Sequence, residues 1–166
     1  MSDEGLLLLA NGLIIVAITG FVIIRQFSVR EVRPEMLIWT ALLIARGCFP
    51  PGPARATGAG IALLAAALVV SVIFGVLRGT TMPMWRTDDG RVVRKGGRVT
   101  LWLWLATIAA RLVLGAIGNA AFAEPLNFNA LWLGMGVTLG VQHLVMTRRA
   151  GAAPLAAPDD AEPAIR

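Results

Sequence analysis

Five apolar runs, separated by short segments that carry most of the arginines, constrain this chain more than any other feature. They cover residues 5–24, 34–49, 60–77, 99–118 and 126–146. About 20 helical residues at 1.5 Å each cross the roughly 30 Å hydrocarbon core of a bilayer. Because 57% of the 166 residues are hydrophobic and only 15% are charged, the chain has too few polar side chains to cover a soluble fold. We therefore predict an all-α integral membrane helical bundle with five transmembrane spans.

The second run is the shortest, and the distribution of positive charge indicates that it crosses the membrane. If all five runs cross with the N-terminus outside, twelve of the fifteen cationic residues lie in cytoplasmic segments and only Arg55 lies in an external loop. This asymmetry satisfies the positive-inside rule. The acidic residues Asp3 and Glu4 before the first run are unlike the basic start of a signal peptide. We expect a multi-pass protein of a bacterial cytoplasmic membrane, with its N-terminus outside and its C-terminus in the cytoplasm.

The membrane domain of residues 1–149 contains one large cytoplasmic loop, residues 78–98, and is followed by a tail. Asp89 and Gly90 stand between two short apolar runs of this loop, which favours a small β-hairpin with its turn at residues 87–90. The alternative is a disordered basic loop. The tail, residues 150–166, is rich in alanine and proline and is expected to be disordered.

Arg111 lies inside the fourth run, where a buried guanidinium costs ~2.5 kcal/mol or more unless its charge is paired, hydrated or reaches the interface. From its distance to residue 118 it lies roughly 10 Å below the external boundary. We hypothesise a polar cluster in the outer half of the bundle, which forms an externally open pocket for an anionic or polar ligand or a contact point for an acidic group of a partner. The alternative is that Arg111 reaches external phosphates or backbone carbonyls and holds the helices in register. The predicted cluster consists of Arg111, Asn11, Arg46, Asn119 and Glu124.

Five cations of the cytoplasmic loop are candidate contacts for anionic lipid headgroups or for the acidic surface of a partner. Each cation near the leaflet contributes about 1 kcal/mol of attraction. The alternative is that these charges only determine the topology. Because the cations lie between apolar runs rather than on one folded face, a nucleic-acid partner is not expected. The candidate contacts are Arg86, Arg91, Arg94, Lys95 and Arg98.

The sequence contains one cysteine and one histidine, which excludes an internal disulfide and a multi-histidine metal centre. We expect no cofactor, no metal and no catalytic site. Small residues recur at four-residue spacing in two runs, at Gly75 after Ala67 and Ser71, and at Gly136 and Gly140. This spacing favours close packing of helices within the bundle and, more weakly, a homodimer.

Three segments resemble the CcdC-like family of small bacterial integral membrane proteins. They are F-V-I-I-R-Q-F at the end of the first run, R-P-E-M-L-I-W before the second, and D-G-R-V-V-R-K-G-G followed by a tryptophan-rich run that carries an arginine. The resemblance covers residues 5–146. It implies a compact multi-span bundle of unknown biochemical role, associated with a cytochrome c maturation locus, and it supplies no catalytic residues. The lone Cys48 argues against electron transfer by thiols in this chain.

Two hypotheses for the function follow. The first is a non-catalytic accessory or scaffold subunit of a membrane process, such as redox-protein maturation or envelope homeostasis, with a membrane-protein partner or a second copy of itself. The second is a small transporter or ligand-binding membrane protein that uses the pocket around Arg111. The second requires Arg111 to face a hydrated cavity within the bundle or between two protomers, whereas the first lets it point to lipid headgroups.

Overall fold

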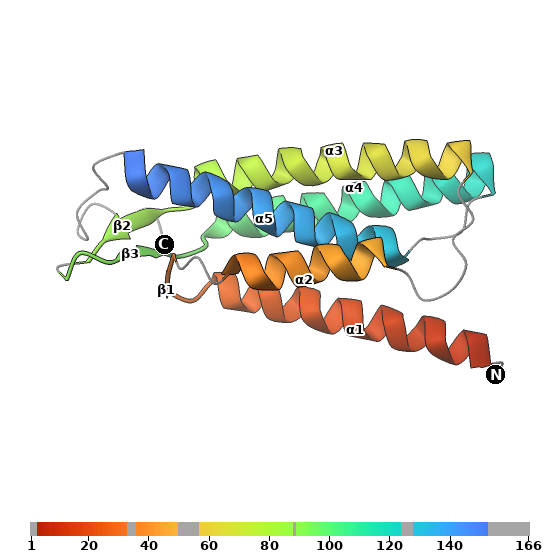
Figure 1. Cartoon of the computed structure of the whole chain (residues 1–166), viewed down its shortest axis with the longest axis horizontal. Helices are drawn as coiled ribbons and strands as arrows, with labels where there is room; N and C mark the ends of the chain where they lie inside the picture. Colours follow the sequence, from red (N-terminus) through yellow and green to blue (C-terminus); the bar gives the residue numbers. More distant parts are fainter. Residues whose placement is uncertain (1–2, 33–35, 50–56, 88, 124–127, 153–166) are drawn as a thin grey trace.

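The computed structural model describes residues 3–32, 36–49, 57–87, 89–123 and 128–152. Over these residues the chain is mainly helical, and consecutive helices run in alternating directions along the long axis of the molecule (Figure 1). The helices are α1 (Asp3–Gln26), α2 (Met36–Cys48), α3 (Gly58–Thr81), α4 (Arg98–Phe122) and α5 (Phe128–Ala152).

Three of the described helices, α3, α4 and α5, are long and apolar enough to cross a membrane. The described apolar parts of α1 and α2, Gly12–Gln26 and Met36–Cys48, are shorter. The expected all-α membrane bundle therefore agrees with the structure at the level of a helical protein with three candidate spans.

The helix ends follow local rules of capping. Thr57 is the N-cap of α3, and its hydroxyl accepts a hydrogen bond from the Gly60 N–H at 2.9 Å. Pro83 follows the end of α3, where the residue before a proline is disfavoured in a helix. Helix α4 ends at Ala123, whose φ of 52° is left-handed and whose N–H donates to the carbonyl of Gly118.

Helix α5 packs against both α2 and α3, and glycines permit the close approach. A Cβ built on Gly136 would lie 2.8 Å from an Ile44 side-chain carbon on α2. On the other side of α5, a Cβ on Gly75 of α3 would lie 2.8 Å from the carbonyl oxygen of Thr138. The predicted close packing at Gly75, Gly136 and Gly140 within the bundle is thus confirmed.

A small antiparallel sheet lies at one end of the bundle (Figure 1). Its strands are β1 (Arg30–Glu31), β2 (Met84–Arg86) and β3 (Val92–Arg94), in the order β1-β3-β2. The turn between β2 and β3 contains Gly90, whose φ is 81° and whose N–H donates to the Thr87 carbonyl at 2.8 Å. The sequence analysis did not anticipate β1, because two residues carry no recognisable strand period.

Two expected boundaries were wrong. Helix α3 continues to Thr81, so Arg78 belongs to the helix and not to the cytoplasmic loop. Helix α5 continues to Ala152, so the first residues of the expected disordered tail are helical. The tail from residue 153 onward lies outside the described residues.

The described bundle exposes large apolar side chains and buries both apolar and polar ones. Large apolar side chains such as Val16, Ile61 and Trp102 are exposed along the helices, whereas many buried side chains are polar. This distribution is typical of helices whose surroundings are lipid, because lipid gives no reason to bury apolar surface. The buried polar side chains are Gln26, Thr40, Ser71, Arg78, Arg94, Thr100, Thr107, Thr138, Gln142 and His143.

Candidate functional site

Arg111 on α4 points into the bundle and is held by oxygens from two other helices. Its Nη2 donates to the hydroxyl of Ser71 on α3 at 3.1 Å and to that of Thr138 on α5 at 3.3 Å. Its Nη1 donates to the carbonyl oxygen of Leu131 on α5 at 3.1 Å. The absent side chain of Gly134 makes room, because a Cβ there would lie 2.7 Å from Nη2. The three helices therefore form a cradle for one guanidinium.

Arg111 stands farther from the end of its helix than the sequence predicts. Helix α4 extends from Arg98 to Phe122, so Arg111 stands near the middle of the helix, about 16 Å from its end. Its Nε is buried and has no hydrogen-bond partner among the described residues.

The predicted cluster around Arg111 is not assembled in the described part of the chain. Arg46 instead donates to the side-chain oxygen of Asn129 at 3.1 Å, and its guanidinium carbon lies 6.0 Å from the centre of the Trp132 ring. Asn119 is exposed on α4. Predicted depth locates residues along the bundle axis but says nothing of the direction in which each side chain points. The side chain of Asn11, and the whole of Glu124, lie outside the described residues.

Arg78 on α3 is a second buried arginine, which the sequence analysis assigned to the cytoplasmic loop. It is 0% exposed. Its Nε donates to the carbonyl oxygen of Phe74 at 3.3 Å, and its Nη2 donates to the hydroxyl of Thr107 on α4 at 3.5 Å. The guanidinium carbon lies 4.0 Å from the centre of the Trp104 ring, a favourable cation–π distance. Its Nη1 is buried without a partner among the residues described.

A sequence signal for the burial of Arg78 did exist. Ser71, Gly75 and Arg78 follow the spacing i, i+4, i+7, which places all three on one face of α3. The small residues of this face pack against α5. A residue at the next position on the same face of α3 is therefore expected to point into the bundle.

A row of side-chain hydrogen bonds joins α1, α4 and α5 near the sheet. The indole N–H of Trp104 donates to Gln26 Oε1 at 2.9 Å, and Gln26 Nε2 donates to Gln142 Oε1 at 3.4 Å. The backbone carbonyl of Gln26 accepts a bond from the Gly96 N–H at 2.7 Å. Trp104 thus connects the stacked Arg78 to the end of α1.

The basic residues of the loop differ in their exposure. Arg94 on β3 is 7% exposed, and its Nη1 donates to Met82 Sδ at 3.2 Å. Burial, and to a lesser extent the nearby Arg30, lower the pKa of Arg94. Arg94 is therefore not available as the headgroup contact that was expected of it, because antiparallel pairing turns it under the sheet.

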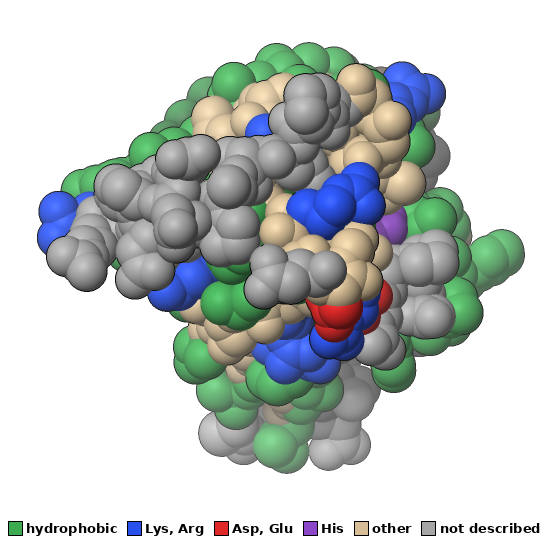
Figure 2. Space-filling view, turned by 90° about the vertical axis from the view of Figure 1, so that its left-hand side faces the viewer, with side chains coloured by type: hydrophobic (Ala, Val, Ile, Leu, Met, Phe, Trp, Pro, Cys, Tyr) green, Lys and Arg blue, Asp and Glu red, His purple; other side chains and the backbone are tan. Residues whose placement is uncertain are grey.

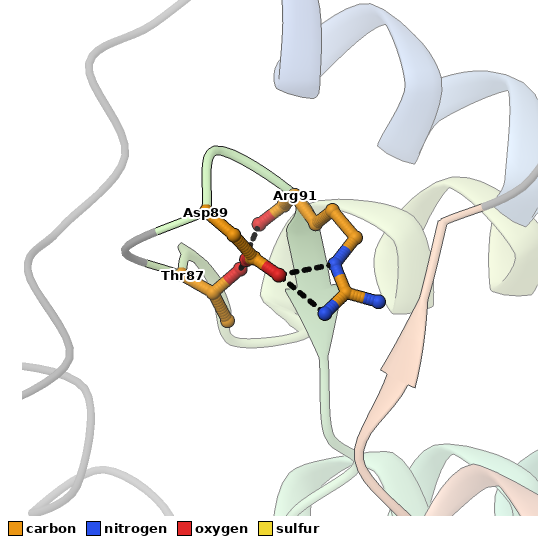
Figure 3. Close-up of polar contacts among 3 residues, drawn as sticks. All are labelled: Thr87, Asp89 and Arg91. Carbon is orange, nitrogen blue, oxygen red and sulfur yellow. Dashed lines mark hydrogen bonds and ion pairs between the residues drawn. The ribbon is translucent and has the colours of Figure 1, made fainter.

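Two other loop cations have partners at the turn. Arg91 Nε donates to Asp89 Oδ2 at 2.7 Å, and the Thr87 hydroxyl donates to the same carboxylate (Figure 3). These bonds lower the pKa of Asp89 to about 2. Arg86 Nη1 donates to the Gly90 carbonyl at 2.9 Å.

Arg86, Arg91 and Arg98 are exposed and Lys95 is half-buried, in keeping with the basic side chains visible at the sheet end of the molecule (Figure 2). These four remain the candidate contacts for headgroups or a partner.

The helices around Arg78 and Arg111 carry no carboxylate. The sequences of α3, α4 and α5 contain no aspartate and no glutamate. In the described part of the chain, no three His, Cys, Asp or Glu side chains gather where a metal ion could be held. What the arrangement offers chemically is positive charge and N–H donors inside an apolar bundle.

No family model, no curated protein and no solved structure matches this chain.

Proposed function

We propose that this protein is a multi-pass membrane protein that binds a small anionic ligand inside its helix bundle, at Arg111. The position of Arg111 carries the proposal. Its guanidinium stands near the middle of an apolar helix and donates to neutral oxygens of Ser71, Thr138 and Leu131. Neutral acceptors satisfy N–H groups but leave the buried charge uncompensated, and such charges are ordinarily paired. A bound anion compensates the charge.

The same position argues against the scaffold hypothesis in its simple form, which lets Arg111 point to lipid headgroups. The resemblance to the CcdC-like proteins stays a prediction from sequence motifs, and the proposal does not depend on it.

We further propose that all five helices cross the membrane, with the N-terminus outside and the sheet in the cytoplasm. The alternating helix directions and the gathering of basic residues at the sheet end support this topology (Figures 1 and 2). The free and exposed Cys48 at the end of α2 provides the test. A membrane-impermeant maleimide should label it in intact cells, with Cys48→Ser as the blank. Labelling that requires permeabilised cells would refute the topology.

Anion binding is tested by thermal unfolding in a neutral detergent, followed by tryptophan fluorescence. Chloride, phosphate, sulfate and small carboxylates are compared at constant ionic strength. The wild type should be stabilised by at least one of these anions in a saturable way, and Arg111→Gln should lose the effect. The matched control is Arg46→Gln, because Arg46 bonds to Asn129 instead of to the cradle.

A wild type that responds to none of the anions would refute the proposal. A co-purified protein retained equally by the wild type and Arg111→Gln would then favour the scaffold hypothesis.

A further inference from the structure

We infer that Arg78 is the second cation of this site, and that the ligand is an oxoanion of the phosphate or sulfate type held between the guanidiniums of Arg78 and Arg111. This inference rests on the proposed function. It adds a residue that the sequence analysis placed in the cytoplasmic loop, and it names the chemical class of the ligand.

Both arginine side chains reach across between α3 and α4, because each bonds to a hydroxyl on the other's helix. Arg111 on α4 donates to Ser71 on α3, and Arg78 on α3 donates to Thr107 on α4. Thr107 and Arg111 are four residues apart, so they stand one helical turn apart, about 6 Å. The Nε bond of Arg78 to Phe74 turns its side chain back along α3 toward Ser71. The guanidiniums therefore lie about one turn apart in level.

Each guanidinium retains a buried donor. Arg78 Nη1 and Arg111 Nε lack a hydrogen-bond partner in the described part of the chain, although buried N–H groups are ordinarily paired. The Trp104 ring covers one face of the Arg78 guanidinium and leaves its edge for hydrogen bonding. A guanidinium is a planar fork of N–H donors, and here each of the two forks has one nitrogen without a partner among the described residues. An oxoanion has several oxygens and can accept from both arginines at once, so the donors favour it over a halide.

The charge balance favours an anion with two negative charges. Two cations about one turn apart repel each other, and α3, α4 and α5 carry no acidic residue to separate them. A doubly charged oxoanion between the two guanidiniums neutralises both and replaces repulsion with attraction. The oxoanion belongs either to a free ion or to the phosphate of a lipid headgroup, and the two sources share the same chemistry.

The test measures the affinity of the purified, delipidated protein for inorganic phosphate by titration calorimetry in a neutral detergent. Arg78→Gln should weaken binding by about 10- to 100-fold, the worth of a charge-assisted hydrogen bond. Arg78→Lys, which keeps the charge but not the fork, should fall between Arg78→Gln and the wild type. The matched control is Arg25→Gln, because Arg25 is an exposed arginine in the last turn of α1 that lies over the Phe21 ring, away from α3 and α4.

The two proposals fail in different ways. If the wild type binds neither phosphate nor any other anion, the proposed function fails. If Arg111→Gln abolishes phosphate binding but Arg78→Gln or a folded Arg78→Lys binds as tightly as the wild type, the inference fails and the proposed function stands. If Arg78→Gln does not fold, the phosphate affinity of Arg78→Lys decides whether the inference holds.

A second measurement distinguishes the two sources of the oxoanion. Native mass spectrometry of protein purified with its lipids compares the wild type with Arg78→Gln and Arg78→Lys. A phospholipid retained by the wild type, displaced by inorganic phosphate and lost from either variant supports the inference with a lipid as the source. If the phospholipid stays bound in both variants and phosphate does not displace it, the inference is overturned for a lipid ligand.

Discussion

Gly134→Ala tests the cradle of Arg111 more directly than removing the arginine does. A methyl group at this position would lie 2.7 Å from Arg111 Nη2 and 3.0 Å from both Arg111 Cζ and Ser71 Oγ. These separations are shorter than any ordinary contact of a Cβ, so the guanidinium has to move. Moving it breaks or strains its bonds to Ser71, Thr138 and Leu131.

The expected loss of stability follows from these contacts. Three hydrogen bonds at about 0.6 kcal/mol each, the average between membrane helices, amount to ~2 kcal/mol. At about 1.5 kcal/mol each, the lower value for bonds to a charged group, they amount to ~4.5 kcal/mol. Replacing glycine by alanine within a helix by itself stabilises the helix by about 1 kcal/mol, which offsets part of this loss. We therefore expect Gly134→Ala to lower the free energy of unfolding by about 1–3.5 kcal/mol.

The assay is unfolding of the purified protein by increasing fractions of sodium dodecyl sulfate in a mild detergent, followed by circular dichroism. Gly20→Ala is the matched control, since a Cβ there meets no atom within 4 Å, and it should be as stable as the wild type or slightly more stable. The destabilisation by Gly134→Ala should largely disappear in an Arg111→Ala background. If Gly134→Ala is as stable as Gly20→Ala, the guanidinium does not occupy the cradle and the reasoning is refuted.

Three further results are expected. Trp104→Phe should keep an aromatic ring over Arg78 but leave Gln26 Oε1 without its 2.9 Å hydrogen bond. It should lower the free energy of unfolding by about 1–2 kcal/mol in the same assay. Trp104→Leu, which also removes the ring over Arg78, should lower it further. Because the pKa of Asp89 is lowered to about 2, the stabilisation of the turn by its carboxylate is complete above pH ~4, the ordinary range of an aspartate, and is lost as the pH falls through about 2. Carboxyl NMR titration should show this pKa, and Arg91→Gln should raise it toward 4; an unchanged midpoint would contradict the ion pair. Gly90→Ala should destabilise the turn by about 1–2 kcal/mol because φ is 81°, and unchanged amide exchange at Thr87 and Gly90 would contradict that conformation.

The exposed turn and the buried arginines contribute to the protein in different ways. Asp89 and Arg91 are fully exposed, so their ion pair is screened by water and salt and shapes the turn more than it stabilises the fold. Arg78 is fully buried and Arg111 is half-buried, so water screens their charges less than it screens the exposed pair, and an anion that reaches them meets a stronger attraction. This contrast is why the proposed function is placed inside the bundle and not on its basic end.

The helical class, with apolar segments long enough to cross a membrane, could be predicted from the sequence because its causes are local. Apolar runs about 20 residues long must form helices in lipid, where each backbone N–H and C=O has to be bonded within its own segment. The glycines that bring helices together were likewise recognisable from their four-residue spacing, since residues so spaced lie on one helix face. The turn at Gly90 rested on equally local signals.

Only the tertiary structure decided which polar groups meet. The membrane depth predicted from the sequence placed Arg46 and Arg111 in one cluster. In the structure, the Arg46 side chain bonds to Asn129. The Arg111 side chain bonds to Ser71 and Thr138. Arg78 changed from a loop cation to a buried one when α3 proved to extend to Thr81. Hydropathy defines the level of a residue along the bundle axis, whereas the rotation of each helix about its own axis is set by packing against its neighbours. That rotation, which no single segment encodes, turns Arg78 and Arg111 toward the neighbouring helices of the bundle.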